Sequence, residues 1–273
     1  EHTSIAARQV LLGEARGTTD RLQFFDARMR DLDLETSTRI GIEVSEINSL
    51  AAGIAKLNGE IAGGYAATGQ PPNDLLDERD RLLDRLAERI NVNVVEQDGA
   101  VVNVFVGNGQ ALVLNTSSNR FGTAPDPFDA TRQRITLTGA QGNTDVTSAL
   151  SGGSLGGLLD FRAEVLDPTR NALGRIATGM ADSLNNQHRR GQDLTGALGT
   201  DLFAVGAATA AAHSGNAGAA VIAVVRSDVA SLTSADCQLE FSAGSWNLRR
   251  TDPGAADRPD VGRPLPAAEL LLR

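Results

Sequence analysis

The residues with the clearest potential for chemistry are acidic side chains spaced along residues 73–90. They recur at steps of three and four, which places them along one side of a helix: Asp77, Asp80, Asp84 and Glu88. Such a row could bind a divalent cation or act as a catalytic acid and base. A neighbouring row of Arg81, Arg85 and Arg89 offers ion pairs instead, for example Asp77 with Arg81. We interpret the carboxylates as a solvated helix face.

Histidine and cysteine, which often carry catalysis or hold metals, are few and scattered. The histidines are His2, His188 and His213, and the single cysteine, Cys237, excludes an internal disulfide and a cysteine-based metal cage. His188 beside Arg189 could bind a small anion, but a solvated helix end is the simpler interpretation. The motifs HExxH and CxxC do not occur. We predict no catalytic, cofactor-binding or metal-binding residue, so the protein is expected not to be an enzyme.

A glycine cluster over residues 152–157 precedes a predicted helix and resembles a phosphate-binding loop. No Lys-Ser or Lys-Thr follows it, and the GxGxxG spacing is absent. Close backbone packing or a hinge explains the glycines better. Asn115-Thr116-Ser117 fits the N-glycosylation pattern, which matters only in a source that uses that pathway.

Length and composition set broad limits. The 273 residues allow one large domain or two smaller ones, with 41% hydrophobic but only 4% aromatic residues. The net charge is −9, the only lysine is Lys56, and no basic block suits nucleic acid. No apolar run is long enough to span a membrane. The chain opens at Glu1 without Met or a signal-peptide pattern, so we expect a trimmed part of a longer protein.

The chain is organised around residues 22–61. Apolar residues recur there in steps of three and four, interrupted by Thr36: Leu22, Phe25, Met29, Leu32, Ile40, Val44, Ile47, Leu50, Ile54, Leu57 and Ile61. This pattern predicts one narrow apolar stripe on a long helix over about 20–63. The helix could belong to an ordinary bundle or to a true supercoil. Residues 17–20 are expected to weaken it, and Gly63 with Gly64 to end it.

Two further helices are predicted. One covers 73–90, with Asn73 as N-cap after Pro71 and Pro72, and forms an antiparallel hairpin with the first helix. The other covers 153–187, and Pro168 is expected to kink it. Both are expected to pair with the apolar stripe.

Between these helices the period changes to two, which predicts a β insertion over 91–147 on the helical body. Asn108 and Gly109 predict a type I′ hairpin turn with positive φ at both residues. Further turns are predicted at 97–99 and 139–143, and a strand at 134–137.

Residues 199–252 differ in composition and predict the start of a second, β-rich domain. It would hold a buried strand at 219–225 and a hairpin of 237–241 with 246–250. Residues 253–273 form an atypical tail that could be a tag, a cloning scar, a frame-shifted sequence or native domain. The predicted class is α+β: an elongated antiparallel α-helical rod bundle with a β-hairpin insertion over 1–198, then the second β-rich domain.

In combination, these segments resemble the bacterial flagellar hook-associated protein 1 family. Residues 44–61 resemble its first rod helix, and the resemblance runs in order over roughly residues 4–250. Its other matches are the family's most recognisable segment at 73–80, its β-hairpin at 94–99 and 107–110, its next helix at 153–162, and its passage to the second domain at 185–203. The family tends to carry an aromatic where Cys237 sits, and 253–273 does not resemble it.

The resemblance implies an exported structural subunit that joins hook to filament on the extracellular bacterial flagellum. It implies hook and filament-side junction proteins and copies of the chain itself as partners, with an export chaperone for the full-length chain. Neither nucleic acid nor membrane is expected as a partner. The alternative is a coiled-coil surface binding module or adhesin with a β-rich recognition part, and an enzyme ranks third.

Overall fold

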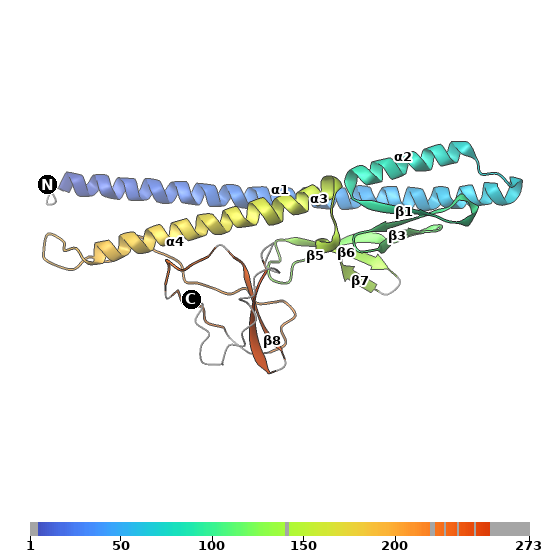
Figure 1. The fold of residues 1–273 in the computed structure, drawn as a ribbon. Helices are drawn as coiled ribbons and strands as arrows, with labels where there is room; N and C mark the ends of the chain where they lie inside the picture. Colours follow the sequence, from blue (N-terminus) through green and yellow to red (C-terminus); the bar gives the residue numbers. More distant parts are fainter. Residues whose placement is uncertain are drawn as a thin grey trace. The chain divides into compact units, whose positions relative to one another are not determined.

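The computed structural model describes residues 5–139, 142–218, 222–226, 228–233, 235–242 and 244–251 (Figure 1). Contacts divide the chain into two compact units. We call Asp33–Arg162 the core unit, and Glu1–Leu32 together with Ala163–Arg273 the split unit. The boundary predicted between residues 198 and 199 is a different division and stays a prediction.

The longest element is α1, Ile5–Thr68, a single helix of 64 residues and roughly 96 Å at 1.5 Å per residue. It extends well beyond the predicted 20–63. The helix is continuous over residues 17–20, where weakening was expected, and the hydroxyls of Thr18 and Thr19 donate to carbonyls four residues earlier. The helix also continues through Gly63 and Gly64 and ends before Gly69, whose φ is 75°.

In the core unit, β structure supplies most of the cover for the apolar side of α1. The buried stripe on α1 is formed by Ile40, Val44, Ile47, Leu50, Ile54, Leu57 and Ile61. From Ile40 to Ile54 it joins one cluster with Leu86 of α2 (Asn73–Arg89), Leu155 of α3 (Gly153–Asp160) and many strand residues, including Val104, Leu112 and Ile135. The two helices that were expected to pair with the stripe therefore share its cover with the sheets. In the split unit Leu22, Met29 and Leu32 of the stripe are only partly buried, and Phe25 is 50% exposed.

Helix α2, Asn73–Arg89, returns along α1 in the predicted antiparallel hairpin. The ring of Pro72 lies against Gly64, and the side chain of Leu82 lies against Gly53. The predicted N-cap is wrong: Pro72 occupies the cap position and Asn73 is the first helical residue. The carbonyl of Pro72 accepts from Leu76 N at 3.2 Å, so the helix starts without a side-chain cap.

Two antiparallel sheets make up the β insertion. The first has the order β1-β2-β3-β4, with bounds Val92–Glu96, Val102–Val106, Gln110–Leu114 and Ser117–Ser118. The second has the order β5-β6-β7, with bounds Arg120–Pro125, Gln133–Gly139 and Gly142–Asp145. Short 3₁₀ turns lie at η1, Asp98–Ala100, and η2, Thr147–Ala149. The predicted turn at 139–143 includes residues 140 and 141, which lie outside the described part of the chain.

The predicted type I′ turn is wrong. The register Val106↔Gln110 leaves three residues between β2 and β3, and Asn108 does not have a positive φ. Gly107 and Gly109 take positive φ instead, at 53° and 91°. The two glycines flank Asn108, so the chain can reverse without forcing the asparagine into the left-handed region.

The third helical region is irregular before Pro168 rather than at it. Helix α3, Gly153–Asp160, passes into a π-helical segment, η3, Phe161–Leu166, and α4 then covers Asp167–Arg189. Pro168 sits in the first turn of α4, where its missing N–H costs little. The wide turn thus precedes the proline.

The predicted C-terminal hairpin is confirmed by β8, Cys237–Ser242, and β9, Ser245–Arg250. The predicted buried strand at 219–225 is wrong for the residues described there, because Ile222 and Val225 are exposed and lie outside any strand. The tail at 253–273 lies outside the described residues, and the α+β class is confirmed.

Candidate functional site

The predicted carboxylate row of α2 faces solvent. Asp77, Asp80, Asp84 and Glu88 are all exposed. The predicted Asp77–Arg81 ion pair is wrong, because the guanidinium of Arg81 pairs with Glu78 at 2.5 Å and reaches only the main-chain carbonyl of Asp77. Among the residues that the structure describes, no group of three or more His, Cys, Asp or Glu could hold a metal ion.

Two arginines of α2, Arg85 and Arg89, bind α1. Arg85 pairs with Glu46 at 2.8 Å, and Arg89 pairs with Glu43 at 3.0 Å. Two members of the predicted arginine row therefore hold α2 against α1 instead of forming ion pairs within α2. The arginines were correctly placed on one side of the helix, but their partners lie on another element.

The two histidines in the described part of the chain, His188 and His213, each contact nearby backbone. The ring of His188 contacts the carbonyl oxygen of Thr200, and Nδ1 of His213 accepts from Gly215 N at 2.9 Å. His2 lies outside the described residues. The two rings have separate backbone partners and share no site. Among the described residues, the structure therefore shows no histidine-based catalytic arrangement.

The glycine cluster allows close backbone packing. A Cβ on Gly153 would lie 2.3 Å from the carbonyl carbon of Arg89, and Gly153 has a φ of 58°. A Cβ on Gly156 would lie 2.6 Å from the carbonyl carbon of Ser151. The start of α3 therefore lies directly against the end of α2, as the close-packing interpretation required.

Residues 152–156 also match G-x-S-x-G, a serine-hydrolase pattern that the search for catalytic motifs in the sequence missed. In such enzymes the serine occupies a sharp turn from a strand into a helix. Here Ser154 is the second residue of α3, and its hydroxyl donates to Oε2 of Glu43 at 2.7 Å. The local geometry is that of a helix start held to α1.

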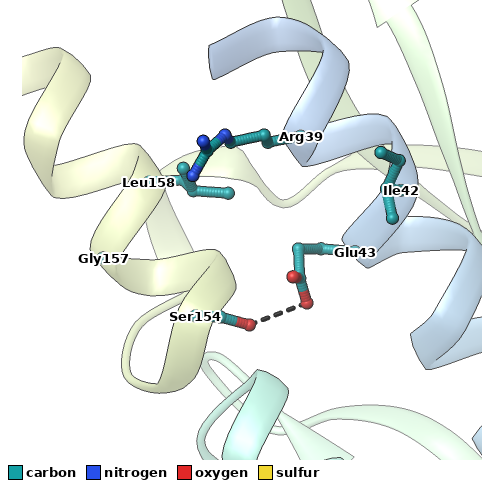
Figure 2. Close-up of a pocket in the computed structure, with 6 residues that line it drawn as sticks. All are labelled: Arg39, Ile42, Glu43, Ser154, Gly157 and Leu158. Carbon is teal, nitrogen blue, oxygen red and sulfur yellow. Dashed lines mark hydrogen bonds between the residues drawn. The ribbon is translucent and has the colours of Figure 1, made fainter. Parts of the chain in front are cut away.

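A shallow, open groove lies between α1 and α3 in the core unit (Figure 2). Its lining residues are Arg39, Ile42, Glu43, Ser154, Gly157 and Leu158. Figure 2 shows Arg39 extending across the groove to Leu158, and the Ser154–Glu43 hydrogen bond closing its other end. Ile42 is 61% exposed beside it. The groove is thus an apolar and charged surface between two helices rather than a pocket with convergent catalytic groups.

A buried ionic cluster lies at one end of the core unit. Asp33 Oδ1 is 3.3 Å from Arg162 Nε, and Asp33 Oδ2 is 3.2 Å from Arg132 Nε. Arg162 also donates to Ser37 Oγ at 2.7 Å and to the carbonyl of Gln133 at 3.4 Å. The side chains of Asp33 and Arg162 are each only 10% exposed. Sequence reasoning did not single out this cluster, although Arg162 falls at an apolar position of its helix.

Two asparagines on α1 bind strand backbone. Asn58, fully buried, donates to the carbonyls of Val102 and Asn115 at 2.7 and 2.6 Å and accepts from Val102 N at 3.2 Å. Asn48 exchanges two hydrogen bonds of 2.8 Å with the backbone of Phe121. These amides attach α1 to both sheets. The sequence signal was a polar residue inside the apolar stripe, between Ile54 and Ile61.

A buried arginine supports a left-handed backbone position. Arg79 on α2 is 6% exposed, and its Nη1 donates to the carbonyl of Ala100 at 2.5 Å. Ala100 has a φ of 61°, which an L-residue other than glycine rarely adopts. Arg79 therefore connects α2 to the loop that joins β1 and β2.

In the split unit, the loop after α4 folds back on the helix end. Asn185 accepts from the amides of Leu202 and Phe203 and donates to the carbonyl of Phe203. Within the loop, the Thr195 hydroxyl and then the Ala197 amide donate to Asp193 and hold its pKa below the usual value. The loop is thus ordered by backbone-binding side chains.

The described residues contain no helix with an apolar stretch long enough to cross a bilayer.

Comparisons with known proteins identify relatives along most of the chain. A family model described as the flagellar hook-associated protein FlgK helical domain matches residues 2–203. Flagellar hook-associated protein 1 of Escherichia coli strain K12 is 35% identical over 249 residues, which are 90% of this chain and 45% of that protein. The same-named protein of Salmonella typhimurium is 37% identical over 251 residues, again 90% and 45%.

A solved structure agrees with these sequence matches. The flagellar hook junction protein FlgK from Burkholderia pseudomallei has a TM-score of 0.84 and 32% identity, covering 91% of this chain and 45% of that one. The chain thus spans about half the length of the relatives it matches. The resemblance found in the sequence is confirmed, and the chain belongs to the flagellar hook-associated protein FlgK family.

Proposed function

We propose that this chain is the helical-domain part of a structural subunit that joins hook to filament in the bacterial flagellum. The observation that carries the proposal is the shared fold with the hook junction protein from Burkholderia pseudomallei, together with the family match over residues 2–203. The subunit acts by presenting helix surfaces to its neighbours. It performs no catalysis.

The core unit suits such a role because it stiffens one side of a long helix and leaves other sides open. The stripe on α1 is covered by two sheets and α2, and the Asn48 and Asn58 amides fix the sheets in register. Beside the groove between α1 and α3, Ile42 and Arg39 remain exposed. A rigid helix with an accessible outer side is suitable for lateral packing against other helical subunits.

The proposed partners are hook proteins, filament-side junction proteins and further copies of this subunit, with an export chaperone for the full-length chain. The proposed location is the exterior of the cell, on the flagellum, after export through the flagellar secretion apparatus. These assignments rest on the family and on the names of the relatives.

The test is localisation of the full-length product that contains this chain. Gold-labelled antibody against the core unit should mark one narrow position between hook and filament, and deletion of the gene should leave cells with hooks but no attached filament. Re-expression should restore filaments and swimming. Labelling spread over the cell surface with intact filaments in the deletion strain would instead support the adhesin alternative and reject the proposal.

A further inference from the structure

We propose that the buried Asp33–Arg162 pair is a register lock for the π-helical segment η3. The lock holds the wide turns of Phe161–Leu166 in place, and without it the segment relaxes toward α-helical spacing. This conformational device concerns the chain's own residues and does not depend on which partners the subunit has.

Arg162, the second residue of η3, is anchored at three points. Its Nε lies 3.3 Å from Asp33, its Nη2 donates to Ser37 at 2.7 Å, and its Nη1 donates to the carbonyl of Gln133 at 3.4 Å. The anchors come from two elements, α1 and β6. A planar guanidinium bound on several sides cannot slide along or turn about the helix axis without breaking these contacts.

The anchor on α1 is itself fixed. Arg132 Nε lies 3.2 Å from the second oxygen of Asp33 and 3.7 Å from Asp129. Asp33 is therefore held between two arginines, and all three side chains are largely withdrawn from water. Asp33 cannot follow Arg162 if η3 changes its spacing.

Such a buried ionic cluster is better suited to choosing a conformation than to adding stability. Removing charges from water costs several kcal/mol per ion, which offsets much of their attraction, whereas fixing register is the best-attested use of buried polar groups. Relaxation of a single wide turn would move the side chains that follow by about 1.5 Å along and about 100° around the helix axis.

Pro168 removes one backbone hydrogen bond that could otherwise distinguish the two spacings. A proline cannot donate to a carbonyl four or five residues earlier, so neither spacing gains a backbone hydrogen bond at that position. The two spacings are the two states of the proposed element, and the contacts of Arg162 with Asp33, Ser37 and Gln133 favour the π-helical one.

The test compares three variants of the 273-residue chain by NMR. Asp33→Leu/Arg162→Met replaces the pair with apolar side chains of similar size, and Ser37→Ala removes one anchor. Arg39→Met is the matched control, since it breaks the exposed Arg39–Glu35 pair on the same helix. We expect a second set of amide resonances for residues 161–170 in the double variant. We also expect at least tenfold faster amide exchange over 161–166 in Ser37→Ala, and less than a twofold change in Arg39→Met.

A single, parent-like set of resonances in the double variant would overturn the proposal. If the double variant does not fold, Ser37→Ala decides alone: exchange over 161–166 within twofold of the parent would reject the lock, and a tenfold rise confined to that segment supports it. Faster exchange spread evenly over the core unit would show a general loss of stability and would also reject it.

Discussion

Asp33 and Arg162 lie 3.3 Å apart, and they are also the first and last residues of the core unit. Asp33, in α1, begins the unit, and Arg162, in η3, ends it. One ion pair therefore joins the two ends of a segment that contains α2 and both sheets. This arrangement gives the pair a role in closing the unit, besides the register role proposed for it.

Replacing one member of this pair should be costly. Arg162→Met leaves Asp33 buried beside a single remaining arginine, and we expect a loss of roughly 3 kcal/mol in the free energy of unfolding. Arg39→Met breaks an exposed pair with Glu35 and should cost less than about 1 kcal/mol. Urea unfolding followed by circular dichroism measures both. Equal effects of the two substitutions would show that burial of the pair does not matter.

The amide of Asn58 should be equally hard to replace. Asn58→Leu keeps the volume but leaves the backbone N–H and C=O of Val102 and the carbonyl of Asn115 without their partner. Each unpaired buried group costs about 1–3 kcal/mol, so we expect a loss of at least about 3 kcal/mol. Asn186→Leu, on the exposed side of α4, should change stability by less than about 0.5 kcal/mol. Thermal and urea unfolding of both variants provide the comparison.

Regular hydrophobic spacing predicted the main elements because burial on one side of a helix repeats in sequence. The steps from Ile40 to Ile61 located the buried side of α1, and the change of period after Asn91 located the sheets. Helix ends were harder to predict, since Thr18 and Thr19 can bond either within a helix or in a turn. The hairpin turn was misassigned because Gly107, not only Gly109, takes a positive φ.

The sequence alone could not predict which residues pair with Asp33. The members of this buried ionic cluster come from α1, η3 and the residues next to β6, and only the folded chain brings them together. A sequence can show that Arg162 interrupts an apolar series, but not which carboxylate it meets. The family resemblance named the right segments, including Asn58 and Arg79, without showing that these residues bind backbone carbonyls.

Substitution of alanine at two glycines of α3, Gly153 and Gly157, should have opposite effects on stability. Gly153→Ala would place Cβ 2.3 Å from the backbone of Arg89 at a φ of 58°, so we expect a loss of several kcal/mol or failure to fold. Gly157→Ala has open space and lies inside a helix, so it should stabilise the protein by up to about 1 kcal/mol. Differential scanning calorimetry of the two variants and the parent compares their melting temperatures. Similar melting temperatures for the two variants would contradict the close packing of α3 on α2.

The loop after α4 should carry a local dependence on pH that is controlled by Thr195. The pKa of Asp193 is lowered from 3.8, first by the hydroxyl of Thr195 and then by the amides of Ala197 and Thr195. Because the folded pKa lies below the unfolded one, the contribution of Asp193 to loop order is fully present above pH 3.8. It is lost as the pH falls through the lower, folded pKa.

Thr195→Val removes the largest of these hydrogen bonds while keeping the β-branched shape. We expect the pKa of Asp193 to rise toward its usual value in this variant, so that the amide of Ala197 loses its ordered signal at a higher pH than in the parent. An NMR titration of the aspartate carboxyl carbons, read with the Ala197 amide, measures both changes. Thr209→Val, in an exposed stretch further along the chain, is the control and should leave the titration of Asp193 unchanged. If Asp193 titrates alike in the parent and in Thr195→Val, the hydroxyl does not bind the carboxylate in solution, and the prediction is wrong.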